Sequence, residues 1–148
     1  MPEEPDADHQ WGFRTRALHA GARPDPTTGA RATPIFQTSS YVFEDADDAA
    51  DLFALQKFGM VYSRLGNPTV SAFEERMASL EGGIGAVAAS SGHAAEFLSV
   101  TALASAGAHI VSSSHLYGGT ITMFSNTLAR FGIETTFVYP TDVDAFAA

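Results

Sequence analysis

The stretch AVAASSGHAAEFLSV (residues 86–100) places Ser90, Ser91 and Gly92 between an apolar run and a helical pattern. In open α/β sheets, ligands bind beyond the carboxyl ends of the strands, where the amino ends of helices point their positive dipoles outward. Gly92 lets a ligand approach the backbone, and the N–H groups of Gly92 and His93 would face an anion, most naturally a phosphate. The alternative is a tight turn in which small residues only fit the available space.

A second stretch, YSRLGNPT (residues 62–69), contains Tyr62 and Arg64 two positions apart on a predicted loop. An extended backbone would project both side chains to the same side. The guanidinium group of Arg64 has a planar fork that suits phosphate, and Tyr62 adds a hydroxyl group. The alternative is a surface arginine beside a tyrosine that packs on the core.

A third stretch, SHLYGGT (residues 114–120), follows a second apolar run as SSGHAA follows the first. Both turns should therefore open on the same edge of the sheet. Tyr117 would lay its ring over a planar ligand there, and Gly118 and Gly119 would allow close approach. The alternative is an ordinary buried tyrosine before a helix.

Other ligand motifs do not fit the sequence. A P-loop needs a lysine after its last glycine, but the single lysine, Lys57, stands elsewhere. The glycines of a dinucleotide-binding fingerprint follow a strand, whereas GGIG (residues 82–85) precedes an apolar run, which argues against a dinucleotide-binding module. The five histidines lack metal-ligand spacing, so we predict no metal site.

Composition narrows the classes of partner. A net charge of −9 and scattered basic residues argue against nucleic acid. The sequence has no cysteine, which excludes disulfides and thiolate chemistry and fits a reducing cytoplasm. No apolar run approaches the roughly 20 residues of a membrane helix, and the acidic start MPEEPDADHQWG is unlike a signal peptide. We therefore predict a soluble cytoplasmic protein with no nucleic-acid or membrane partner.

The pattern of apolar residues predicts an α/β fold. After a disordered tail (residues 1–12) and a loop-like segment (residues 13–40), helical spacing alternates with short apolar runs. In chain order we expect a helix over 45–59, a helix capped by Asn67 that has Pro68 at its first position and ends at Gly82–Gly83, a strand over 84–89, a helix over 93–104, a strand over 109–114, a helix over 118–132, a strand over 134–140 and a helix from 141 or 142. Such alternation forms βαβ units and a mainly parallel sheet. Because the last helix has run only about two turns at Ala148, we expect a longer protein.

Together these motifs resemble the amino-terminal part of the Cys/Met-metabolism family of pyridoxal-phosphate (PLP) enzymes. TRALHAGARPDPTTGARATPIFQTSSYVF resembles the family's amino-terminal arm, YSRLGNPT its signature, SSGHAA its phosphate turn and LYGGT its ring-stacking turn. The resemblance covers residues 14–148. It implies the aspartate aminotransferase-like fold (fold type I), with an arm and helix over 13–60 that pack on a neighbouring subunit. Residues 61–148 would begin the PLP-binding large domain, which would be incomplete here.

The resemblance assigns roles to matching positions. Ser91, Gly92 and His93 match the turn that holds the cofactor phosphate, and Tyr117 matches the tyrosine that stacks on the pyridine ring. The resemblance also places Tyr117 among the catalytic residues.

Tyr62 and Arg64 match residues that, in the family, reach the cofactor phosphate of a neighbouring subunit. The resemblance places Tyr62 among the catalytic residues as well. It also implies a homo-oligomer, usually a tetramer, and explains the arm as a segment that packs on other subunits.

Within the family, the arm and LFALQKFGMVYSR look most like O-acetylhomoserine sulfhydrylases. Such an enzyme replaces the acetate of O-acetyl-L-homoserine with sulfide and so makes L-homocysteine for methionine biosynthesis. Cystathionine γ-synthase, methionine γ-lyase and a truncated, non-catalytic assembly partner remain alternatives. Another thiol in place of sulfide as the nucleophile, and a succinyl in place of an acetyl ester in the substrate, also remain alternatives.

The resemblance also implies a lysine that binds PLP as a Schiff base. In the family this lysine lies well past the position of residue 148, and Lys57 is interpreted as a solvated helix lysine. We therefore expect the 148 residues alone not to catalyse the reaction.

Overall fold

The computed structural model describes residues 11–147. The chain divides into two compact units, one ending at Ala88 and one beginning at Ala89, and each is described by itself. The tail predicted for residues 1–12 lies outside the described residues up to residue 10, and Trp11 and Gly12 lead into the first helix.

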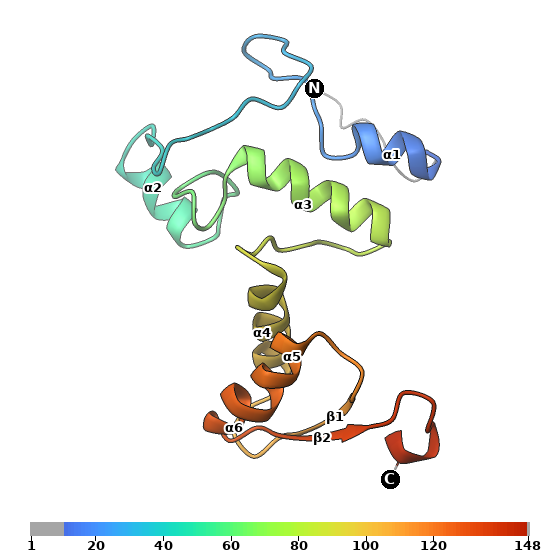
Figure 1. Ribbon diagram of the computed structural model, residues 1–148. Helices are drawn as coiled ribbons and strands as arrows, with labels where there is room; N and C mark the ends of the chain where they lie inside the picture. The colour runs from blue at the N-terminus through green and yellow to red at the C-terminus, as the bar shows by residue number, and fades with distance from the viewer. Residues whose placement is uncertain (1–10, 148) are drawn as a thin grey trace. The chain divides into compact units, whose positions relative to one another are not determined.

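The first unit contains α1 (Phe13–His19), α2 (Ala46–Phe53) and α3 (Pro68–Glu81) (Figure 1). The sequence predicts the ends of α3 correctly. The side chain of Asn67 accepts a hydrogen bond from the Thr69 N–H at 2.9 Å, and Pro68 occupies the first helical position. Gly82 ends the helix in the left-handed conformation, with φ of 70°.

The loop predicted for residues 13–40 is wrong for residues 13–19, which form α1. A helix of seven residues is marginal alone, so its stability depends on packing against α3. Arg16 donates to the carbonyl oxygen of Ser79 in α3, and Arg76 Nε donates to the carbonyl oxygen of Ala20 at 2.9 Å. These contacts join residues about 60 positions apart, which no local pattern can show.

The helix predicted over 45–59 is shorter in the structure, where α2 ends at Phe53. Asp45 caps its amino end by accepting from the Asp48 N–H at 2.8 Å. Leu55 adopts a positive φ of 57°, which the right-handed helix cannot continue through.

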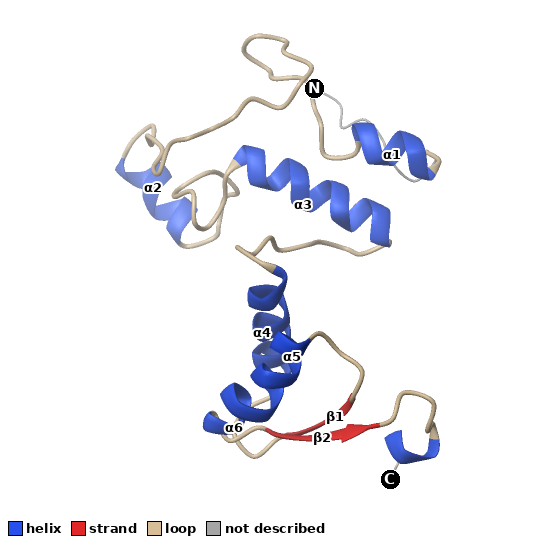
Figure 2. Ribbon diagram, viewed as in Figure 1, coloured by secondary structure: helices blue, strands red, loops and turns tan. Residues whose placement is uncertain are grey.

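The second unit begins with α4 (Gly92–Leu103), followed by strand β1 (His109–Ser113). The connection to strand β2 (Glu134–Val138) consists of α5 (Gly118–Thr122), the π-helical segment η2 (Met123–Thr127) and α6 (Leu128–Arg130). The two strands pair in parallel, with His109 opposite Glu134 and Ser113 opposite Val138 (Figure 2). This strand–helix–strand unit confirms the predicted α/β fold class.

The core of the second unit lies between the helical connection and the sheet. Met123, Leu128 and Ile133 are buried there, and Phe97 and Val100 of α4 pack against them. The helix predicted over 118–132 is present, but it contains a π-helical segment. Gly132, with φ of 74°, lies just after its end.

Two predicted elements are absent from the described residues. Residues 84–89 form no strand, and Ile84 and Val87 are exposed. A strand forms only when a neighbour pairs with it, and the described part of the chain offers these residues no partner. The predicted helix from residue 141 or 142 is only the short 3₁₀ segment η3 (Asp144–Phe146). No described helix has the length and apolar character needed to cross a membrane.

Candidate cofactor site

The amino end of α4 offers backbone donors to a ligand. Ser91 caps the helix: its Oγ accepts from the Ala94 N–H at 3.1 Å and its carbonyl oxygen accepts from the Ala95 N–H at 3.0 Å. Among residues 11–147, no acceptor is found for the N–H groups of Gly92 and His93. Because these donors lie at the positive end of a helix of 12 residues, they suit an anion.

Gly92 separates the two interpretations of this turn. A Cβ atom built at Gly92 would meet no described atom within 4 Å, and its φ lies outside the left-handed region. Neither packing nor backbone strain therefore explains the glycine within the described chain. The open space beside Gly92, together with the N–H groups that lack an acceptor, fits the ligand-binding interpretation.

The amino end of α5 lies against the amino end of α4. A Cβ atom at Gly119 would lie 2.5 Å from Cε1 of Tyr117 and 3.3 Å from Cε1 of His93. Both rings are thus packed around Gly119, and the structure brings Ser91, Gly92, His93 and Tyr117 into one part of the second unit. Tyr117 is 77% exposed in the described chain, which does not fit the alternative of a buried tyrosine.

Tyr62 and Arg64 lie together in the first unit. The guanidinium carbon of Arg64 lies 5.5 Å from the centre of the Tyr62 ring, so both side chains occupy the same side of the loop, as their spacing predicts. Tyr62 is 42% exposed, and its backbone forms an antiparallel bridge with Ser40. The described structure places this pair in a different unit from the other four predicted residues.

Two polar side chains hold the loop that carries Tyr62 and Arg64. Nδ2 of the buried Asn67 donates to the carbonyl oxygen of Phe36 at 2.9 Å. Thr69 Oγ1 donates to the carbonyl oxygen of Pro34 at 2.8 Å and accepts from the Phe36 N–H at 2.9 Å. The sequence indicates Asn67 only as a helix cap, because these partners lie more than 30 positions away.

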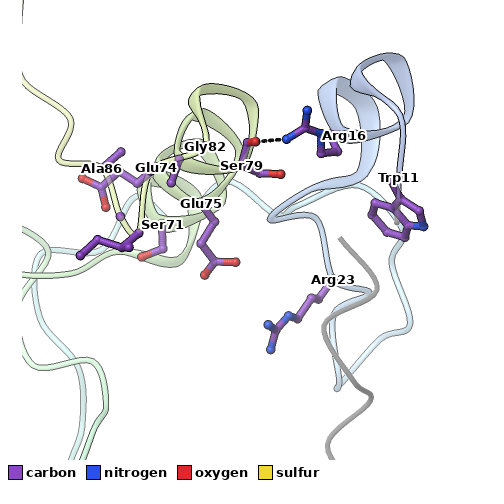
Figure 3. A pocket seen from close by; sticks show the side chains of 13 residues that line it. Trp11, Arg16, Arg23, Ser71, Glu74, Glu75, Ser79, Gly82 and Ala86 are labelled. Atoms are coloured by element: carbon purple, nitrogen blue, oxygen red, sulfur yellow. Dashed lines mark hydrogen bonds between the residues drawn. The ribbon is translucent and has the colours of Figure 1, made fainter. Parts of the chain in front are cut away.

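A cavity of about 860 Å³ lies in the first unit, beside α1 and α3 (Figure 3). Its lining includes Arg16, Arg23, Glu74 and Glu75, so charges of both signs face it. None of the predicted site residues lines this cavity.

Lys57 is an ion-paired surface lysine, and its predicted position on a helix is wrong because α2 ends at Phe53. Its Nζ lies 2.5 Å from Oδ1 of Asp48, and this hydrogen bond raises the pKa of Lys57 above 10.5. The same hydrogen bond lowers the pKa of Asp48 below 3.8. The described residues contain no cluster of three or more potential metal ligands.

Comparison with known proteins identifies the family. Residues 14–148 match the family model of the Cys/Met metabolism PLP-dependent enzymes. The O-acetyl-L-homoserine sulfhydrylase 1 of Thermus thermophilus is 56% identical over 84% of this chain and 30% of its own length. The O-acetyl-L-homoserine sulfhydrylase of Corynebacterium glutamicum is 54% identical over 94% of this chain and 32% of its own.

A solved structure agrees with this result. It belongs to a Campylobacter jejuni protein named as an O-acetylhomoserine (thiol)-lyase and contains N'-pyridoxyl-lysine-5'-monophosphate. It matches with a TM-score of 0.88 and 40% identity, over 93% of this chain and 34% of that one. The chain thus spans about a third of the length of these relatives. The chain belongs to the Cys/Met metabolism family of PLP-dependent enzymes.

The residues at the amino ends of α4 and α5 fit the cofactor of this family. PLP carries a phosphate group and a planar pyridine ring. The N–H groups of Gly92 and His93 suit the phosphate, and no described atom lies within 4 Å of a Cβ atom built at Gly92. The exposed ring of Tyr117 offers an aromatic face nearby.

Proposed function

We propose that the protein containing this chain is a PLP-dependent O-acetyl-L-homoserine sulfhydrylase. It replaces the acetate group of O-acetyl-L-homoserine with sulfide and releases L-homocysteine and acetate. The names of the Thermus thermophilus and Corynebacterium glutamicum relatives support this substrate assignment. The observation that carries the proposal is the open pair of N–H groups at Gly92 and His93 beside the exposed ring of Tyr117.

In this proposal each residue has a defined task. The N–H groups of Gly92 and His93 donate to the cofactor phosphate, and the hydroxyl group of Ser91 keeps the first turn of α4 in place. Tyr117 covers one face of the pyridine ring and keeps water from it. When bound, PLP would supply the electron sink that permits proton loss at the α and β carbons of the substrate and departure of acetate from its γ carbon.

Tyr62 and Arg64 act on a neighbouring subunit in this proposal. Their adjacent side chains present a hydroxyl group and a guanidinium fork, which are suitable donors to a phosphate. Their assignment requires a homo-oligomer, with a tetramer as the expected form. Lys57 is paired with Asp48, and the proposal assigns the Schiff-base lysine to another part of the protein. The cytoplasmic location stays a prediction from the sequence.

The test uses the protein expressed from its complete reading frame and loaded with PLP. We expect it to form homocysteine from O-acetyl-L-homoserine and sulfide, with a lower kcat/KM for O-succinyl-L-homoserine. Formation of cystathionine from L-cysteine at a higher rate would identify a cystathionine γ-synthase. Release of methanethiol from L-methionine as the main reaction would identify a methionine γ-lyase. A PLP-bound protein without any of these reactions would contradict the enzymatic proposal and favour an assembly partner.

A further inference from the structure

A hydrogen bond between two side chains links α4 to α5. Thr120 Oγ1 donates to Oε2 of Glu96 at 2.8 Å, and Thr120 is only 6% exposed. No other hydrogen bond is found between these two helices in the described part of the chain. Figure 1 shows α4 and α5 next to each other in the second unit.

The linked residues stand three positions after two residues of the candidate site. Glu96 follows His93 in α4, and Thr120 follows Tyr117 at the start of α5. His93 and Glu96 lie on the same face of α4, about 4.5 Å apart along its axis, and Tyr117 is the residue directly before α5. Thr120 directly follows Gly119, and a Cβ atom built at Gly119 would lie close to the rings of both His93 and Tyr117.

Burial makes this contact costly to lose. Because the hydroxyl group of Thr120 is shielded from water, it needs a partner inside the protein. The carboxylate of Glu96 supplies a charged acceptor, and hydrogen bonds to charged groups are stronger than those between neutral groups. The bond fixes the position of α5 along α4, and Tyr117 precedes α5 directly.

We infer that Glu96 and Thr120 are a positioning pair that sets the ring of Tyr117 relative to the N–H groups of Gly92 and His93. In this inference both residues act through the position of Tyr117 and not by direct contact with the cofactor. This role rests on the proposed cofactor site at the amino ends of α4 and α5.

The experiment uses the protein from its complete reading frame, with PLP as the probe. The dissociation constant of PLP and the visible circular dichroism of bound PLP are measured for Thr120→Val, Thr120→Ser and Glu96→Ala. We expect Thr120→Val to raise the dissociation constant about tenfold, the value of one lost charge-assisted hydrogen bond, and to change the dichroism. Thr120→Ser keeps the hydroxyl group and should show the wild-type dissociation constant and the wild-type dichroism. Thr101→Val is the matched control, because Thr101 bonds only within α4.

A double variant tests whether the two residues act as a pair. Glu96 is exposed, so Glu96→Ala should fold even where Thr120→Val does not. The double variant should bind PLP no more weakly than either single variant, because the same bond is already lost. Losses of PLP affinity that add up in the double variant would contradict the inference that the two residues act as a pair. Unchanged dichroism in Glu96→Ala would contradict it as well.

Comparison with Gly92→Ala separates this inference from the proposed site. Weaker PLP binding in Gly92→Ala with normal binding in Thr120→Val and Glu96→Ala would overturn the positioning pair and keep the site. Normal binding in all three variants would overturn the site as well.

Discussion

Replacing Gly92 with alanine separates cofactor binding from folding. The added methyl group would meet no described atom within 4 Å, so it creates no clash in the described chain. Alanine also forms helices better than glycine, and such exchanges stabilise proteins by about 0.4–1 kcal/mol where the backbone permits them. We therefore expect Gly92→Ala to keep or slightly raise the free energy of unfolding.

The same methyl group would project into the open space beside the backbone of Gly92, where we propose that the cofactor phosphate approaches. A phosphate displaced from the N–H group of Gly92 or of His93 loses a charge-assisted hydrogen bond of about 1.5–3 kcal/mol. Because about 1.4 kcal/mol corresponds to a factor of ten, the dissociation constant of PLP should rise roughly 10- to 150-fold.

Two measurements decide this prediction. The dissociation constant comes from a titration with PLP followed by absorbance, and the free energy of unfolding comes from denaturation in urea without PLP. Gly85→Ala is the matched control, because Gly85 also has open space around it and no positive φ. Wild-type PLP affinity in Gly92→Ala would refute the ligand-binding interpretation. Equal losses of stability and affinity would instead favour the packing interpretation.

Three further perturbations test other parts of the account. Arg64→Ala should raise the dissociation constant of PLP, whereas the control Arg130→Ala should not. The same dissociation constant for Arg64→Ala and the wild type would contradict a role of Arg64 in the phosphate site. Tyr117→Ala should weaken PLP binding and lower kcat, whereas Tyr117→Phe should keep PLP affinity; identical affinities of the two variants would contradict ring stacking. Asp48→Asn should lower the pKa of Lys57 toward 10.5, as measured by NMR titration, and an unchanged value would contradict their hydrogen bond. The lowered pKa of Asp48 means that its stabilising effect is present above pH 3.8 and is lost as pH falls through the lowered value. The raised pKa of Lys57 means that its effect is present below pH 10.5 and is lost as pH rises through the raised value.

Local signals in the sequence were sufficient for some elements. Asn67, Pro68 and Gly82 fix the ends of α3 through a cap, a preset φ and a left-handed conformation, all of which depend on nearby residues. The strands β1 and β2 were also predicted, because their apolar runs lie on either side of a helical pattern. Apolar residues alone did not make a strand of residues 84–89, since a strand needs a partner.

The sequence indicates the candidate residues at the starts of α4 and α5, but not the Glu96–Thr120 contact behind them. Ser91, Gly92 and Tyr117 stand out in the sequence because small residues and an aromatic residue next to predicted helix starts have a chemical meaning, whereas the exposure of the Tyr117 ring comes from the structure. The contact between Glu96 and Thr120 was not predicted, because it joins residues 24 positions apart. Its only signal in the sequence is that each residue stands three positions after a site residue, and this becomes informative once α4 and α5 are known to be neighbours.

A crystal structure of the protein from its complete reading frame with PLP tests the central claim most directly. The account predicts that the phosphate oxygens accept hydrogen bonds from the N–H groups of Gly92 and His93, at about 2.7–3.2 Å from each nitrogen, with the Tyr117 ring on one face of the pyridine ring. A phosphate bound elsewhere, with both N–H groups facing water, would contradict it.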